Sequence, residues 1–153
     1  PFDETAVDFL EELDVPAYKI ASAEIIHLPL IKKVAATGKP MIISTGMASA
    51  TEIDEAVRTV RKAGCEQIVL LKCTSTYPAL PENSNVLTIP HMQKLFGCEV
   101  GLSDHTIGIA AGVEKVAQCT LGDEGCLWSS KLLEDVINMG GNGGGGGLTF
   151  NRL

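Results

Sequence analysis

The chain has 153 residues, 45% of them hydrophobic, and its 19 acidic and 12 basic residues give a formal net charge of −7. This length and hydrophobic content suffice for a folded domain with a core and exclude an intrinsically disordered chain. The acidic balance argues against nucleic-acid binding, because neutralising a phosphate backbone requires clustered Lys and Arg.

The first predicted element is a helix near the N-terminus. Asp3 is a good N-cap, and Phe2 and Val7 occupy the two positions of a hydrophobic staple. Val7, Leu10 and Leu13 have the spacing of an apolar stripe on one helix face. We therefore expect this stripe to pack against the core.

Four short apolar runs then alternate with helical patterns. The predicted strands are 17–22, 41–46, 68–75 and 100–106. The predicted helices are 28–37, 50–63, 89–96 and 107–121. A capping box at Ser49 and Glu52 begins the second of these helices, and Gly38 and Gly97 are expected to end the first and third.

This alternation predicts an α/β fold with parallel strands joined by right-handed helical crossovers. A (β/α)₈ TIM barrel and a doubly wound sheet both have this pattern. Only four strands are convincing. The sequence therefore indicates either a partial barrel of about four βα units or an open sheet.

The character of the chain changes after Gly122. Residues 123–139 have a helical pattern, and 140–147 consist of glycine with a single asparagine. A glycine-rich phosphate loop needs spaced glycines between a strand and a helix, which this run lacks. We expect residues 1–122 to form the α/β domain, and 123–153 to form a divergent helix followed by a flexible Gly-rich tail.

Polar side chains gather where the predicted strands end, and in parallel α/β folds these ends meet at one ligand-binding edge. Lys19 lies near the end of the first strand, followed by Ser22 and Glu24, and Ser44 ends the second. A lysine inside a buried sheet needs an anionic partner, so Lys19 is a candidate phosphate or carboxylate clamp or Schiff-base lysine. The plainer alternatives are a lysine reaching solvent from a strand edge and ordinary turn chemistry at Ser44.

The third and fourth strands end in further candidates. Thr74, Ser75 and Tyr77 follow the third strand, and Lys72 shares the parity of Thr74. At the end of the fourth strand, Ser103 and His105 share one face, which makes His105 a candidate metal ligand or general base. The other two histidines, His27 and His91, are expected at the surface.

These segments resemble the sialic acid synthase family, which includes N-acetylneuraminate, legionaminate and pseudaminate synthases. The segments that carry the resemblance are Tyr18-Lys19-Ile20-Ala21-Ser22-Ala23-Glu24, Ile43-Ser44-Thr45-Gly46-Met47, Lys72-Cys73-Thr74-Ser75-Thr76-Tyr77-Pro78 and Gly101-Leu102-Ser103-Asp104-His105-Thr106. The resemblance runs in order from Pro1 to about Leu121. It implies strands four to seven of the family's (β/α)₈ barrel.

The family condenses phosphoenolpyruvate with an N-acylated amino sugar and uses a divalent metal, Mn²⁺ or Mg²⁺. The resemblance implies that phosphoenolpyruvate is held by Lys19, Ser22, Ser44 and Ser103, and that Thr74 and Ser75 lie in the same substrate-binding pocket. It also implies that Glu24 and Tyr77 contact the sugar and that His105 binds the metal, with Lys19, Glu24 and His105 as the catalytic set. Carbon three of phosphoenolpyruvate would attack the sugar aldehyde, water would add at carbon two, and phosphate would leave by C–O cleavage.

The chain departs from the family pattern after Gly122. The family's second metal-ligating His is expected there, and no His follows His105. The family's first three strands have no counterpart here either. The resemblance thus implies a transferase that is incomplete and inactive as this chain alone.

Two other functions stay open on the residues. One is a Schiff-base pyruvate aldolase acting through Lys19 or Lys72, which needs no metal. The other is a noncatalytic half-barrel that binds an anion or a partner. A half-barrel exposes edge strands and one sheet face, so we expect a homo-oligomer.

The expected compartment is the cytoplasm. The five cysteines are odd in number and have no Cys-x-x-Cys spacing, which favours reduced thiols over a disulfide framework. No signal peptide is visible, and no apolar run is long enough to cross a membrane. Small-molecule substrates are thus the expected partners, with no nucleic acid and no membrane.

Overall fold

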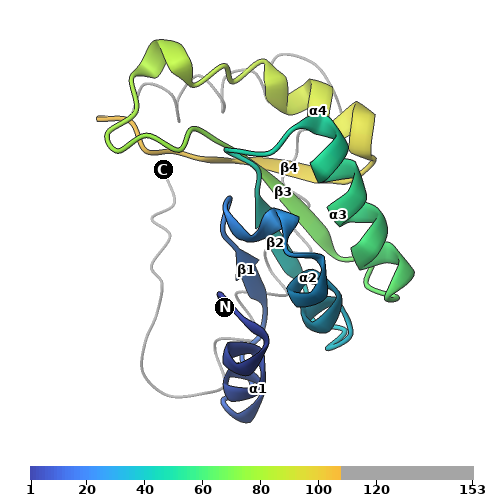
Figure 1. The fold of residues 1–153 in the computed structure, drawn as a ribbon. Coiled ribbons are helices and arrows are strands. Elements are labelled where there is room, and N and C mark those ends of the chain that lie inside the picture. The colour runs from blue at the N-terminus through green and yellow to red at the C-terminus, as the bar shows by residue number, and fades with distance from the viewer. Residues whose placement is uncertain (108–153) are drawn as a thin grey trace.

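The structure is a computed structural model that describes residues 1–107, and these contain one parallel sheet of order β1-β2-β3-β4 (Figure 1). The strands are β1 (Tyr18–Ile20), β2 (Met41–Ser44), β3 (Ile68–Cys73) and β4 (Glu99–Ser103). The helices are α1 (Glu4–Glu12), α2 (Leu28–Ala35), α3 (Ala50–Lys62) and α4 (Thr88–Phe96), with short 3-10 helices η1 (Glu24–Ile26) and η2 (Pro81–Asn83). The predicted alternation is therefore confirmed as far as β4. The predicted helix 107–121, beyond its first residue, and the whole of 123–153 lie outside the described residues.

The helix boundaries follow the local signals of the sequence. The Asp3 carboxylate accepts a hydrogen bond from the backbone N–H of Ala6 at 2.8 Å and so caps α1. Ser49 and Glu52 form the predicted capping box of α3. Gly97 ends α4 in the left-handed conformation, with φ of 60°, which glycine adopts without a steric penalty.

The predicted packing of α1 is partly wrong. Val7 is buried, but Phe2 is 76% exposed and Leu13 is 59% exposed, so neither the staple nor the end of the stripe is covered. The physical reason is position: α1 lies beside β1 at the edge of the described sheet and packs on α2 (Figure 1). A helix at an edge has a neighbour on one side only.

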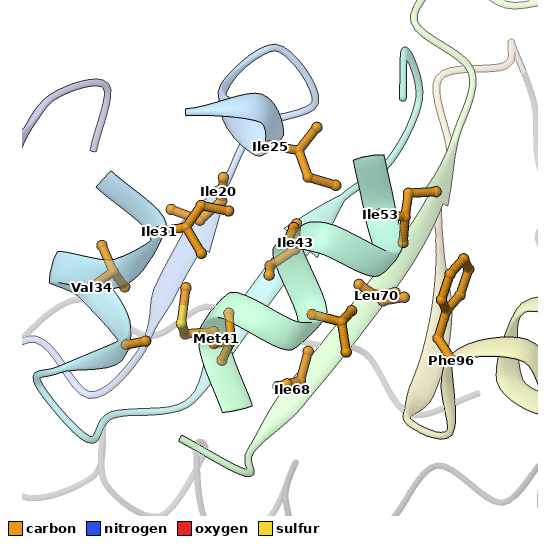
Figure 2. Packing of buried hydrophobic residues seen from close by; sticks show 14 of the residues in the cluster. Ile20, Ile25, Ile31, Val34, Met41, Ile43, Ile53, Ile68, Leu70 and Phe96 are labelled. Carbon is orange, nitrogen blue, oxygen red and sulfur yellow. The ribbon is translucent and has the colours of Figure 1, made fainter. Parts of the chain in front are cut away.

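The core lies between the sheet and the helices. The strand residues that face it are fully or almost fully buried, and they are Tyr18, Ile20, Met41, Ile43, Ile68, Leu70 and Val100. Figure 2 shows α3 lying across β2 and β3, with its Ile53 among the buried side chains that also include Ile43 and Leu70. These strand residues alternate with residues on the other face, as the two-residue period of a strand requires.

The opposite face of the sheet is only partly covered by the described residues. Ile42, Val69 and Leu71 on this face are half-buried, and Lys19, which pairs in register with Ile42, is exposed. Lys19 makes no ion pair within residues 1–107. The expectation of a buried Lys19 with an anionic partner is thus wrong for this part of the chain, because the described residues leave this side chain uncovered. We call this surface the open face.

Two further expectations concern thiols and membranes. Cys65, Cys73 and Cys98 are free thiols, as predicted for the cysteines that the structure describes. Among the helices described, none combines the length and apolar character needed to cross a bilayer.

Candidate functional site

A hydrogen bond connects the ends of β1 and β2. The backbone N–H of Gly46 donates to the Ser22 hydroxyl oxygen at 3.0 Å. Thr45 fixes this geometry, because both its backbone N–H and its hydroxyl donate to the Leu71 carbonyl oxygen of β3, each at 3.0 Å. Ser22 acts here as acceptor, and its own proton has no acceptor within residues 1–107. That proton is available to a ligand.

The ends of β3 and β4 meet on the same face. Cys73 pairs in register with Ser103, and its sulfur lies 3.9 Å from both the Ser75 hydroxyl oxygen and Nδ1 of His105. Gly46 completes the connection from β2, because a Cβ at this position would lie 3.0 Å from the Cys73 sulfur. The residues joined in this way, here called the strand-end cluster, are Ser22, Gly46, Cys73, Ser75, Ser103 and His105.

Three contacts fix the imidazole of His105. Its Nδ1 lies 2.9 Å from the carbonyl oxygen of Thr74, which can only accept, so the proton of the neutral ring is on Nδ1. Its Nε2 therefore carries the lone pair and lies 3.4 Å from the Ser103 hydroxyl oxygen. The Tyr77 ring packs beside it, with ring centroids 4.3 Å apart and a 33° tilt.

His105 has the tautomer that a metal ligand needs. A ligating histidine commonly donates its second ring N–H to a carbonyl or carboxylate, as His105 does to Thr74. Within residues 1–107, however, no group of three or more His, Cys, Asp or Glu side chains is arranged to hold a metal ion. The described residues thus fit a metal only as the source of one ligand, Nε2 of His105.

Thr74 contributes its backbone rather than its hydroxyl. The hydroxyl accepts a hydrogen bond from Nζ of Lys72 at 2.8 Å and donates to the carbonyl oxygen of Asn83 at 3.2 Å. Lys72 has the parity of the core-facing residues, pairing in register with Leu102, which packs on the core. Its burial lowers the pKa of the Lys72 ammonium below its ordinary value. The shared orientation of Lys72 and Thr74 is confirmed, but their side chains do not join the strand-end cluster.

The remaining predicted site residues of the first two strands lie on β1, β2 and η1. Ser44 is 4% exposed at the end of β2, on the open face that also carries Lys19. Glu24 begins η1, and its Oε2 atom is buried without a hydrogen-bond partner within the described residues. A buried carboxylate oxygen without a donor is costly, so Glu24 is suited to accept a hydrogen bond from a ligand. His27 and His91 are exposed, as predicted.

Sequence reasoning missed the central roles of Gly46 and Cys73. The sequence marks Gly46 only as part of the segment that follows the second strand, and Cys73 only as one of several thiols. One signal was present for Cys73, since it has the strand parity of Ser75 and lies two residues before it. No local signal marks Gly46, because its contacts come from neighbouring strands.

Comparison with known proteins gives a consistent result. The NeuB family model matches residues 1–122. The chain is 47% identical over 108 residues to the pseudaminic acid synthase of Helicobacter pylori, covering 71% of this chain and 32% of the relative. It is 43% identical over 119 residues to the N,N'-diacetyllegionaminic acid synthase of Campylobacter jejuni, covering 76% and 36%.

A solved structure shows the same fold. The N-acetylneuraminic acid (sialic acid) synthetase of Leptospira borgpetersenii, in complex with citrate, matches with a TM-score of 0.71 and 33% identity. The match covers 80% of this chain and 42% of that one. The chain thus spans about a third of the length of the two sequence relatives, with 32% and 36% covered.

Proposed function

The chain belongs to the NeuB family, and on this premise we propose that it is part of a nonulosonic acid synthase that condenses phosphoenolpyruvate with an N-acylated amino sugar. The two sequence relatives named above are synthases of pseudaminic and N,N'-diacetyllegionaminic acid, which supports the general synthase function. Because this chain spans about a third of such relatives, we propose that it binds phosphoenolpyruvate without completing the reaction alone.

The strand-end cluster is the observation that carries this proposal. Phosphoenolpyruvate has a phosphate and a carboxylate, and such groups are held by cations and by several hydrogen-bond donors. The hydroxyls of Ser22, Ser75 and Ser103 would supply donors, with Ser44 beside them. Lys19 on the open face would supply the positive charge, and it has no competing ion pair within residues 1–107. The citrate bound by the Leptospira synthetase is likewise a small anion.

The sugar and the metal would lie at the edges of this cluster. Glu24 would accept a hydrogen bond from a sugar hydroxyl through its unpartnered Oε2, and Tyr77 would pack on the sugar beside His105. Thr74 would act through its carbonyl oxygen, which orients His105. When bound, Mn²⁺ or Mg²⁺ would polarise the sugar aldehyde, with Nε2 of His105 as one ligand.

We propose that the sheet is a segment of a (β/α)₈ barrel. Sequential strand order with the core on one side of the sheet is the arrangement of a barrel wall, whereas a doubly wound sheet reverses its strand order. The open face would then be the barrel interior. Because β1 and β4 are edge strands of the described sheet, we further propose that the isolated chain forms homo-oligomers, which sedimentation velocity would detect.

Calorimetric titration of phosphoenolpyruvate into the purified chain tests the function, with and without Mn²⁺. We expect saturable binding that Lys19→Ala weakens roughly tenfold or more, because a charged hydrogen bond is lost. Lys62→Ala is the matched control, since Lys62 is an exposed lysine in the last turn of α3. Absence of binding in a folded sample would contradict the proposal.

A Schiff-base aldolase is the second candidate, supported by the lowered pKa of Lys72. A lower pKa leaves more of the amine neutral and nucleophilic. The position of Lys72 weighs against it, because its Nζ is bound to Thr74 on the core-facing side. Borohydride reduction in the presence of pyruvate, followed by mass spectrometry, would detect a lysine adduct if this alternative holds.

A further inference from the structure

Gly46, which follows β2, lies against residues from the ends of two other strands. Its N–H donates to Ser22 after β1 at 3.0 Å, while its Cα faces Cys73 and Ser75 at the end of β3. A Cβ built on Gly46 would lie 3.0 Å from the sulfur and 3.1 Å from Cβ of Cys73, and it would overlap the Ser75 hydroxyl oxygen. This close approach, and not an unusual backbone conformation, is why glycine is required.

We propose that Gly46 is a positioning residue that sets the separation of the Ser22 and Ser75 hydroxyls and so the fit of the anionic substrate. This inference rests on the proposed function, because it concerns the same cluster. Ser22 is held on one side by the Gly46 N–H, and Ser75 approaches on the other side through the space that a side chain would fill. Both hydroxyls are therefore placed by one backbone unit.

The consequences of adding a methyl group are unequal for the neighbours. The Ser75 hydroxyl is the end of a short side chain and can rotate away from the collision. The Cys73 Cβ is attached directly to the backbone of β3 and cannot. A methyl group at position 46 should thus push the Ser75 hydroxyl aside and press on Cys73, so we expect some loss of stability together with the loss of the donor geometry at the substrate.

The test is a double-mutant cycle on phosphoenolpyruvate affinity, measured by calorimetry on the full chain. Gly46→Ala should weaken binding roughly tenfold or more, as expected for losing one hydrogen bond to a charged group. Ser75→Ala should have a similar effect. The double variant should bind no more weakly than Ser75→Ala, because without the hydroxyl the tightest contact of the added methyl is gone.

Gly101→Ala is the matched control. Gly101 lies in β4, and a Cβ there would meet Cδ2 of Leu71 at 2.8 Å, which is the flexible end of an apolar side chain. This variant should bind phosphoenolpyruvate as the wild type does, and thermal unfolding should confirm that all variants are folded.

The outcomes separate this inference from the proposed function. If the wild type binds phosphoenolpyruvate and Gly46→Ala binds it with the same affinity, the positioning role alone is overturned. Additive losses in the double variant would also overturn it, because Gly46 would then act independently of Ser75. Absence of wild-type binding would overturn the proposed function and the positioning role together.

Discussion

Nδ1 of His105 lies 2.9 Å from the carbonyl oxygen of Thr74, 31 positions earlier in the chain. The segment after β3 therefore orients a ring that follows β4. The backbone N–H of Ala79 strengthens the same connection by donating to the His105 carbonyl oxygen at 2.9 Å. The loop from Thr74 to Ala79 thus supports the candidate ligand on two sides.

This geometry predicts the tautomer of His105. Two-dimensional ¹H–¹⁵N correlation spectra of the neutral ring should show the proton on Nδ1. Ser103→Ala should leave this tautomer unchanged, because the long contact of Ser103 with Nε2 at 3.4 Å does not set it. A proton on Nε2 in the wild-type chain would contradict the predicted orientation.

The two faces of β2 should respond differently to the same truncation. Ile43→Val removes a methylene group from a fully buried side chain, and we expect a loss of about 1 kcal/mol in the free energy of unfolding. Ile42→Val, on the half-buried open face, should cost clearly less. Urea denaturation measures both. Equal losses would mean that the open face is covered in solution.

Tyr18→Phe should lower the stability of the folded chain and make that stability depend less on pH in the acid range. The buried Tyr18 hydroxyl donates to Oε1 of Glu11 at 2.5 Å, and Nζ of Lys39 lies 3.1 Å from the same oxygen. The Tyr18 hydrogen bond, followed by that of Lys39, lowers the pKa of Glu11 from its ordinary 4.5. Because the folded pKa is lower, this stabilisation is present above pH 4.5 and is lost as the pH falls through the folded value.

The variant should therefore melt a few degrees below the wild type at neutral pH, and the difference should shrink in acid. Thermal unfolding followed by circular dichroism between pH 7 and pH 3 would measure it, at pH values chosen to span the ordinary pKa range of carboxylates. Tyr77→Phe is the control, since the Tyr77 side chain is 76% exposed. A difference that stays constant across this range would refute the link to Glu11.

Ser49→Ala should weaken α3 at its start. The Ser49 hydroxyl accepts from the Glu52 N–H at 3.3 Å and donates to the Glu52 carboxylate at 2.8 Å. Loss of an N-cap of this kind costs about 1 kcal/mol, measurable by urea denaturation. Thr51→Ala, an exposed change in the same turn, should cost much less. Similar losses for both would exclude the capping box as the cause.

Much of the candidate site was open to prediction because its residues follow strands in a regular way. Ser22, Ser75, Ser103 and His105 were all expected at one edge, and the structure brings them into one cluster. Thr74 was expected to contribute a hydroxyl, but the structure commits that hydroxyl to Lys72 and Asn83. Thr74 shares the parity of Lys72, so its hydroxyl lies on the other side from Ser75 and the strand-end cluster.

The sequence by itself determined the elements and the family. Caps such as Asp3, Ser49 and Gly97 act within one helical turn, and apolar runs with strand parity predict a parallel sheet without knowledge of distant contacts. Family membership also follows from the order of short motifs along residues 1–122.

Only the tertiary structure decided that Lys19 is exposed, that Thr74 orients His105, and that Gly46 has no room for a side chain. Each of these depends on strand register and on how the sheet brings together residues that are 24 to 31 positions apart in the chain. Local sequence signals act over a few residues, whereas contacts between strand ends are fixed when the sheet forms.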